Sequence, residues 1–292
     1  MDLGKAGVFL GSMALLPAPA MRRAVAEIEA MGFGAIWIGE HVGREPFAAC
    51  AIVLAATERI RVATGIANIW ARDPTAMANG ARTLAEAWPD RFLLGIGVSH
   101  ANLVTSRGHR YDKPLSAMRA YLDAMEQAPY RAPKPEPPPP TVLAALGPKM
   151  LELAKARTAG AHPYFVPVAH TRQARAILGP DRLLAPEHAV VFAPDRLTAR
   201  LAGDTYTRTY LGLPNYHQNL ERLGWSANDL DGAGSDRLFD AVVAWGDEAT
   251  IAEKVREHLK AGADQAVVNV ITPTPDRAPT DELRRLAPLL LA

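Results

Sequence analysis

The sequence predicts an α/β protein in which residues 1–292 form a single (β/α)8 TIM barrel. Eight short apolar runs, many rich in β-branched residues, alternate with helix-like stretches along the whole chain. The runs lack the alternation of polar and apolar residues seen in a half-exposed sheet, which is typical of parallel strands covered by helices. A length of 292 residues suits one such domain. An open, doubly wound sheet is the alternative, because a sequence does not show whether a sheet closes.

The eight predicted strands follow one another at spacings that leave room for a helix between neighbours. In chain order they are Ala6–Leu10, Gly34–Ile38, Ile60–Ala67, Phe92–Val98, Thr141–Leu146, Ala161–Val166, His188–Phe192 and Gln265–Ile271. The stretch Met21–Met31 is amphipathic and ends at Gly32, a helix stop signal. Asp73-Pro74, Gly147-Pro148 and Asp247 are typical of helix starts. Strand, helix and stop signals therefore recur in the order that a barrel requires.

Two stretches depart from this regular alternation. Pro129–Pro140 holds seven prolines in twelve positions, so we expect an extended, stiff connection within the domain. An interdomain linker or a docking segment for a proline-binding module is the alternative. Asp195–Ala244 is too long for one crossover, so we expect an inserted helical segment near the site, between strands seven and eight.

The composition limits the class of partner. The chain has 32 Lys and Arg against 31 Asp and Glu, and no basic stripe with interleaved aromatic residues, so we do not expect nucleic acid as a partner. Its single cysteine, Cys50, excludes an internal disulfide and fits a reducing cytoplasm. The apolar run Val8–Leu16 with the following Ala18-Pro19-Ala20 loosely resembles a secretory signal. We expect the first strand there instead, a cytoplasmic protein and no membrane association.

Polar residues follow the second and fourth predicted strands, where a barrel places its active site. Glu40 and His41 come after the second strand, and Ser99 and His100 after the fourth. An imidazole can move a proton near neutral pH, and an adjoining carboxylate can orient it. We therefore expect chemistry at His41 and Glu40. The alternative is a helix-capping glutamate beside a solvated histidine.

Other strand ends offer weaker signals. Thr64-Gly65-Ile66 indicates a bulge or a close backbone approach, and Leu146-Gly147-Pro148 leads into a helix whose first amides could face an anion. A zinc site built from His41, His100 and His162 is a further hypothesis, but no closely spaced histidine pair supports it. We therefore expect no metal.

Several segments, taken in order, resemble the bacterial luciferase-like monooxygenase superfamily. They are Ala30–His41, Thr57–Ile66, Arg91–Gly97, Arg72-Asp73-Pro74 with Ala81–Leu84, Ala159–Tyr164 and Ala261–Asp264. The branch that the chain resembles most is that of oxidoreductases using the deazaflavin coenzyme F420, because of Leu94–His100 and Ala144–Lys149.

This resemblance implies a tricyclic ring at the carboxyl ends of the strands, with a non-proline cis peptide at Gly65-Ile66. It implies cofactor contacts from Thr64, Gly65, Ile66, Val98, Ser99, Ala145, Leu146, Gly147, Pro148, His162 and Pro163. The expected catalytic residues are His41, Glu40 and His100, and Trp70 and Tyr164 are expected as walls of the substrate pocket. Glu40 stands where relatives more commonly have aspartate, and His100 where they often have a carboxylate.

The function that the resemblance implies is hydride transfer between C5 of the deazaflavin and a small organic substrate, assisted by proton transfer at His41. An FMN-dependent monooxygenase is the nearest alternative, and a non-catalytic protein that binds flavin or deazaflavin is another. A homodimer is expected from the resemblance alone.

Overall fold

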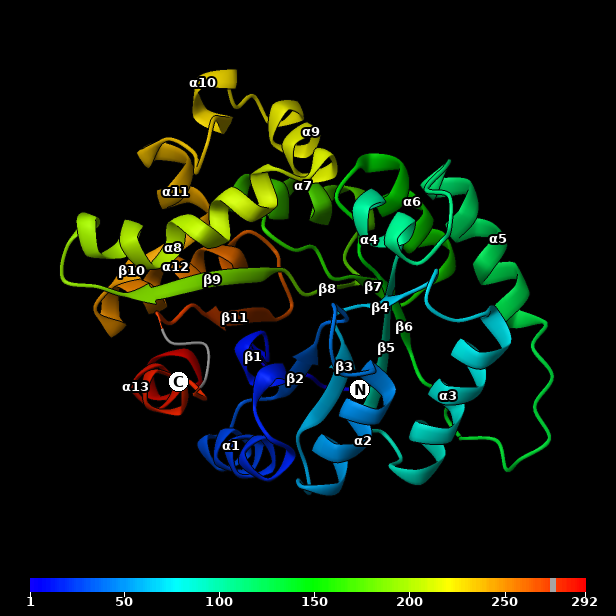
Figure 1. Ribbon diagram of the computed structural model, residues 1–292. Helices are drawn as coiled ribbons and strands as arrows, with labels where there is room; N and C mark the ends of the chain where they lie inside the picture. Colours follow the sequence, from blue (N-terminus) through cyan, green and yellow to red (C-terminus); the bar gives the residue numbers. More distant parts are fainter. Residues whose placement is uncertain (274–276) are drawn as a thin grey trace.

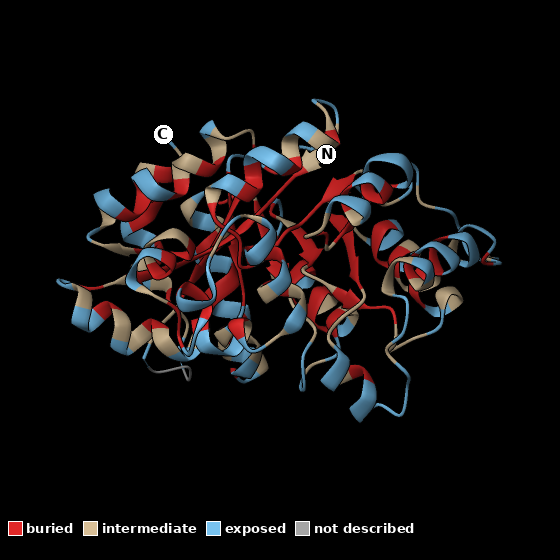
Figure 2. Ribbon diagram, turned by 90° about the horizontal axis from the view of Figure 1, so that it is seen from above, coloured by how far each residue is buried: buried red, intermediate tan, exposed pale blue. Residues whose placement is uncertain are grey.

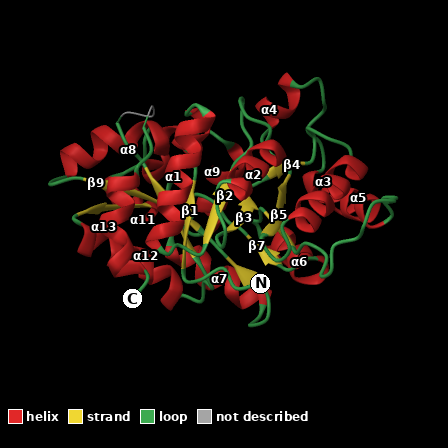
Figure 3. Cartoon of the chain, turned by 90° about the horizontal axis from the view of Figure 1, so that it is seen from below, coloured by secondary structure: helices red, strands yellow, loops and turns green. Residues whose placement is uncertain are grey.

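The computed structural model describes residues 1–273 and 277–292 of the chain. In that part, eleven parallel strands form one curled sheet, with helices packed around it (Figure 3). The strands are β1 (Ala6–Phe9), β2 (Ala35–Ile38), β3 (Arg61–Thr64), β4 (Ala67–Asn68), β5 (Phe92–Gly97), β6 (Thr141–Leu143), β7 (Gly160–Ala161), β8 (Leu183–Leu184), β9 (Glu187–Phe192), β10 (Val243–Gly246) and β11 (Ala266–Val270). Their order is β10-β9-β11-β1-β2-β3-β5-β6-β7-β8, with β4 beside β5.

The sheet returns on itself through β8 and β9, which are successive parts of one extended stretch. On one side of this stretch, the Ala185 amide donates to the Ala161 carbonyl at 3.0 Å. On the other side, the Val267 amide donates to the Pro186 carbonyl at 2.9 Å. The stretch therefore joins β7 to β11, and the predicted barrel is confirmed, with β10 added along β9.

The helices follow the strands, as βαβ crossovers require (Figure 1). They are α1 (Ala18–Met31), α2 (Pro46–Ala55), α3 (Pro74–Ala87), α4 (Ala101–Ser106), α5 (Pro114–Glu126), α6 (Pro148–Arg157), α7 (Val168–Leu178), α8 (Arg196–Leu211), α9 (Pro214–Arg222), α10 (Ala227–Leu230), α11 (Asp236–Val242), α12 (Glu248–Lys260) and α13 (Thr280–Leu290), with a 3-10 turn at Ser12–Leu15. The predicted start signals are confirmed: Asp73 caps α3 by accepting from the Ala76 amide, and Asp247 caps α12 in the same way. Gly32, at φ 95°, ends α1.

Figure 2 shows buried strands surrounded by helices with exposed residues, and the buried side chains form clusters on both faces of the barrel wall. In β2, Ala35 and Trp37 belong to the cluster inside the barrel, whereas Ile36 and Ile38 pack outward with the helices. A third cluster joins α8, α9 and α11 to β9 and β10. The strands are therefore buried on both faces, which explains their continuous apolar sequence.

The structure also corrects the predicted elements. The third predicted strand is broken at Gly65-Ile66 into β3 and β4, and the fifth and sixth are shorter than predicted. The inserted segment is helical as expected, but its last residues begin β10, a strand that was not predicted. Pro129–Pro140 contains neither helix nor strand and joins α5 to β6. Among the described residues, no helix combines the length and apolar character needed to span a membrane.

Candidate active site

A cavity of about 260 Å³ opens at the carboxyl ends of the strands. Its walls come from the ends of β1, β2, β3, β5, β6 and β7, from α4, α5 and α6, and from the inserted helices α8 and α9. The structure brings together there the predicted residues Glu40, His41, Gly65, Ile66, Val98, Ser99, His100, Ala145, Leu146, Gly147, His162 and Tyr164. Segments up to 124 positions apart in sequence, from Glu40 to Tyr164, thus converge on one rim, as a barrel requires.

Four predicted residues lie outside the cavity lining: Thr64, Pro148, Pro163 and Trp70. The Thr64 hydroxyl instead bridges β3 and β5, donating to the Gly95 carbonyl at 2.6 Å and accepting from the Gly95 amide at 2.8 Å. Trp70 was expected to form a wall of the substrate pocket, but it does not line the cavity. Its indole N–H donates to the Val98 carbonyl at 3.1 Å, because a half-buried indole N–H requires an acceptor.

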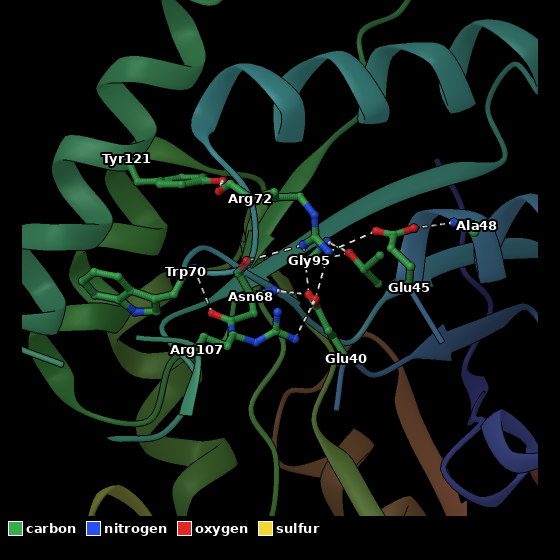
Figure 4. A network of polar contacts seen from close by, with 10 residues as sticks. Glu40, Glu45, Ala48, Asn68, Trp70, Arg72, Gly95, Arg107 and Tyr121 are labelled. Atoms are coloured by element: carbon green, nitrogen blue, oxygen red, sulfur yellow. Dashed lines mark hydrogen bonds and ion pairs between the residues drawn. The ribbon is translucent and has the colours of Figure 1, made fainter. Parts of the chain in front are cut away.

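Glu40 borders the cavity, and its carboxylate points toward Arg72 (Figure 4). The Arg72 guanidinium donates to both Glu40 oxygens at 2.9 Å, and the Asn68 amide donates to Oε2 at 2.7 Å. The Glu40 and Arg72 side chains are only 5% and 12% exposed, and Arg107 lies 3.8 Å away. The Glu40 carboxylate therefore links the end of β4 and the loop that follows it, and its catalytic role stays a prediction.

The floor of the cavity is formed by Gly65 and His162. The peptide bond Gly65-Ile66 is cis, as the resemblance implied. The His162 ring stacks on Trp37 with centroids 4.2 Å apart, and its Nδ1 lies 2.6 Å from the Ala185 carbonyl, so Nδ1 carries the proton. Its Nε2 is buried and has no hydrogen-bond partner among the described residues. Burial lowers the pKa of His162 to about 4, so Nε2 is a free acceptor at the cavity floor.

Two further histidines, His41 and His100, line the cavity. Burial lowers the pKa of His41, against the opposing charge of Glu40. Burial also lowers the pKa of His100, while its hydrogen bond to Asn215 acts in the other direction. The His100 Nδ1 lies 3.2 Å from the Asn215 Oδ1 in α9, and its Nε2 has no hydrogen-bond partner among the described residues. Both rings are therefore neutral near pH 7 and can accept a proton.

The amino end of α6 forms the opposite part of the cavity. Gly147 caps this helix, and Pro148, which has no N–H, opens it. The Met150 amide donates to the Gly147 carbonyl at 3.1 Å, which leaves the Gly147 and Lys149 amides without a backbone acceptor among the described residues. The Arg222 guanidinium of α9 approaches the same point, since a Cβ at Gly147 would lie 3.5 Å from its Nη2. A helix amino end beside a guanidinium is suited to an anion such as a phosphate.

The remaining wall is aromatic and comes largely from α8 and α9. Tyr210 and Tyr216 line the cavity together with Phe9 and Tyr164. Behind them, Glu187 is fully buried and accepts hydrogen bonds from Asn269, Tyr206 and the Phe165 amide. Burial raises the pKa of Glu187 to about 7.

Sequence reasoning did not find the cavity residues of α8 and α9, namely Tyr210, Asn215, Tyr216, Gln218 and Arg222. The only signal there was Leu213-Pro214-Asn215-Tyr216, which indicated a break between helices and no chemistry. Within residues 1–273 and 277–292, no group of three potential metal ligands is close enough to hold an ion.

Residues 3–265 match the family model described as luciferase-like monooxygenase. The chain belongs to this family. Within the luciferase-like family, it is 34% identical over 129 residues to the "Putative coenzyme F420-dependent oxidoreductase Rv3520c" of Mycobacterium tuberculosis (strain ATCC 25618 / H37Rv). That match covers 44% of this chain and only 37% of the relative.

Solved structures share the luciferase-like barrel over nearly all of their length. An F420-dependent secondary alcohol dehydrogenase in complex with an F420-acetone adduct has a TM-score of 0.79, 13% identity and full coverage of both chains. The oxygenating constituent of 3,6-diketocamphane monooxygenase from Pseudomonas putida, in complex with FMN, has a TM-score of 0.72, 15% identity and 98% coverage of both chains. At these identities, the two similarities show the fold.

Proposed function

We propose that this protein is an oxidoreductase that uses coenzyme F420 to act on a small organic substrate. The observation that carries the proposal is the cavity floor, which fits a flat ring. A Cβ at Gly65 would lie 3.1 Å from the His162 Nε2 and 3.2 Å from Phe9, so a side chain there would fill the floor. The buried, unpartnered Nε2 offers an acceptor to a ring N–H. The F420-linked relative supports the deazaflavin over other flat cofactors.

The same cavity can hold both ends of such a cofactor. Gly65 and Ile66 would support the ring, and the amides at the start of α6, with Arg222, would hold the phosphate of the tail. When bound, a deazaflavin supplies a hydride or accepts one at its C5 carbon. The protein contributes binding, orientation and proton transfer.

The neutral histidines are suited to proton transfer. In this proposal His41 accepts or returns the substrate proton, and His100 lies within the same cavity with Nε2 unpartnered. Glu40 acts indirectly, because its ion pair with Arg72 fixes the loop that contains Asn68. The tyrosines of α8 and α9 exclude water from the far side.

An FMN-dependent monooxygenase is the second candidate, favoured by the FMN complex of a structure with the same fold. Titrating the purified protein with F420 and with FMN in parallel separates the two candidates. Bound deazaflavin absorbs at about 420 nm, whereas flavin has bands at about 370 and 450 nm. We expect saturable binding of F420 at lower concentration than FMN, and binding of neither would refute the proposal.

Two variants test the assigned roles. His41→Gln should keep F420 affinity and lose turnover by roughly 10²–10⁴-fold, the contribution typical of general acid–base catalysis. Arg222→Met should weaken F420 while leaving the affinity for the deazaflavin chromophore without its phosphate tail unchanged, so this truncated ligand is the matched control. Retained turnover in His41→Gln would contradict its role. The expected homodimer and cytoplasmic location stay predictions.

A further inference from the structure

Two tyrosine hydroxyls meet at the aromatic wall of the cavity. Tyr164 follows β7 and Tyr210 belongs to α8, and their Oη atoms lie 3.0 Å apart. Both residues line the cavity, and their ring centroids are 4.9 Å apart. The inserted segment and the barrel rim thus contribute one hydroxyl each.

The hydrogen bonds of this pair leave the Tyr210 O–H available to a ligand in the cavity. The Asn269 amide lies 2.8 Å from the Glu187 Oε1 and 3.0 Å from the Tyr164 Oη, so both of its hydrogens are donated. The Tyr164 oxygen therefore accepts this bond. The bond between the two hydroxyls uses one of their two protons. Tyr164 has a second hydrogen-bond partner in the Tyr206 hydroxyl, whereas Tyr210 bonds, among the described residues, only to Tyr164. When Tyr164 donates its proton to Tyr210 or to Tyr206, the Tyr210 O–H remains for the cavity.

The surroundings keep this donor neutral and fixed. Burial raises the pKa of both tyrosines, and the neighbouring Glu187 carboxyl raises it further, so neither ionises near neutral pH. Glu187 also fixes the Asn269 amide that holds Tyr164, because its own oxygens receive bonds from Tyr206 and the Phe165 amide. The Tyr210 hydroxyl therefore keeps its proton near neutral pH and can donate it to a ligand.

We propose that the Tyr164–Tyr210 pair binds an uncharged oxygen acceptor of the substrate, a carbonyl or hydroxyl group on a compact apolar or aromatic body. This inference rests on the proposed function and names the substrate class for the same cavity. An uncharged group is specified because Glu187 lies behind the pair, and the one guanidinium among the described cavity residues, Arg222, lies beside Gly147. The aromatic side chains of Phe9 and Tyr216 form apolar walls around the rest of the substrate.

Three probes of similar size test the oxygen preference. The probes are 4-fluoroacetophenone, 1-ethyl-4-fluorobenzene and 4-fluorobenzoate, and their dissociation constants are measured by ¹⁹F NMR on the full chain, with and without saturating F420. The ketone should bind about tenfold more tightly than the hydrocarbon, as expected for a hydrogen bond to a buried donor, and more tightly than the carboxylate. Equal affinity for ketone and hydrocarbon in the wild-type protein would overturn the proposal without any variant.

Variants then assign the preference to the pair. Tyr164→Phe/Tyr210→Phe should lose it, while each single variant should keep part of it, because the remaining hydroxyl still has a proton to donate. Tyr130→Phe is the matched control, since Tyr130 lies outside the cavity lining and its ring contacts Arg82, and it should keep the preference. The carbonyl stretch of the bound ketone should lie lower in the wild type than in the double variant.

A preference that survives in the double variant would refute the assignment. The F420 titration is independent of these probes. F420 binding without a ketone preference contradicts this inference alone. A ketone preference without F420 binding contradicts the proposed cofactor and leaves the tyrosine site standing.

Discussion

Replacing Arg72 by methionine should destabilise the fold by roughly 3 kcal/mol, because it leaves the Glu40 carboxylate buried without its bidentate partner. Breaking a buried pair by removing one partner typically costs about 3–5 kcal/mol. The lower end applies here, because the Asn68 amide at 2.7 Å and the Arg107 guanidinium at 3.8 Å remain. For a chain of this length the loss corresponds to a fall in Tm of roughly 6–12 °C.

The double-mutant cycle separates this effect from loss of packing. Glu40→Gln alone should cost less than Arg72→Met, because Arg72 keeps Glu45 at 3.0 Å and Glu45 is half-exposed. Combining the two substitutions should recover part of the loss of Arg72→Met, since no uncompensated buried charge then remains. Arg107→Met is the matched control and should cost less than about 1 kcal/mol, because that guanidinium is 40% exposed.

Thermal and urea unfolding of the four variants, followed by tryptophan fluorescence, give the free energies. An Arg72→Met variant within 1 kcal/mol of the wild type, or a double variant less stable than Arg72→Met, would refute the reasoning. The same variants test the link to the site. Arg72→Met should lower F420 affinity, because the ion pair holds the cavity residue Glu40 against Asn68, two positions after the cavity residue Ile66 (Figure 4).

Three further predictions concern pH and packing. The free energy of unfolding should lose nothing to histidine protonation above about pH 6.5 and should fall as the pH is lowered toward 4. The fall is about 1.4 kcal/mol per pH unit for each buried histidine whose pKa is lower in the native state than in the unfolded state. These histidines are His162, His170 and His188, with pKa about 4, and His258, with a pKa well below 6.5. The pKa of Glu187 is raised to about 7, so protonation of this carboxyl between pH 7 and 4.5 stabilises the native state and offsets part of the loss. A free energy of unfolding in urea that stays constant from pH 7.5 to 5 would contradict the prediction. Gly95→Ala should destabilise by more than about 3 kcal/mol in urea unfolding, because its Cβ would lie 2.0 Å from the Thr64 carbonyl oxygen, whereas Gly43→Ala, with nothing within 4 Å, should be tolerated. Asn215→Leu should lower the pKa of His100 further in an NMR titration, because the lost hydrogen bond raises it; an unchanged value would refute that contact.

The fold could be predicted from the sequence where the determining interactions are local. Strand positions follow from apolar runs, and helix starts follow from Asp73 and Asp247, whose side chains bond to amides three residues ahead. The break after Thr64 needs tertiary information, because its hydroxyl bonds to Gly95 on the neighbouring strand. The strand β10 was missed for a related reason, since its four residues directly follow a helix in a segment with helical periodicity.

The sequence predicted where the candidate site lies better than it predicted what each of its residues does. Glu40 and His41 were located correctly by the rule that polar residues at strand ends form the site. The rule does not show which of them is engaged by a residue elsewhere in the chain. Arg72, 32 positions after Glu40, takes up both oxygens of that carboxylate. No spacing pattern reveals an ion pair over such a separation, so the two side chains looked equivalent in the sequence.

The cavity is built from two kinds of segment, the strand ends of the barrel and the inserted helices α8 and α9. The sequence predicts the residues of the first kind better than those of the second. The cavity floor and the amino end of α6 lie at strand ends, and the barrel fixes the position of these ends. The F420-linked and FMN-linked structures have the same barrel fold. The groups that approach from the inserted segment are the Tyr210 hydroxyl, the Asn215 amide and the Arg222 guanidinium. Their placement depends on how α8 and α9 pack on the barrel through Phe165 and Tyr164, which is a tertiary property. Under the proposed function, substrate choice should therefore change with substitution of Tyr210 or Asn215, which leaves the barrel rim untouched, whereas substitution of Arg222 should also weaken F420.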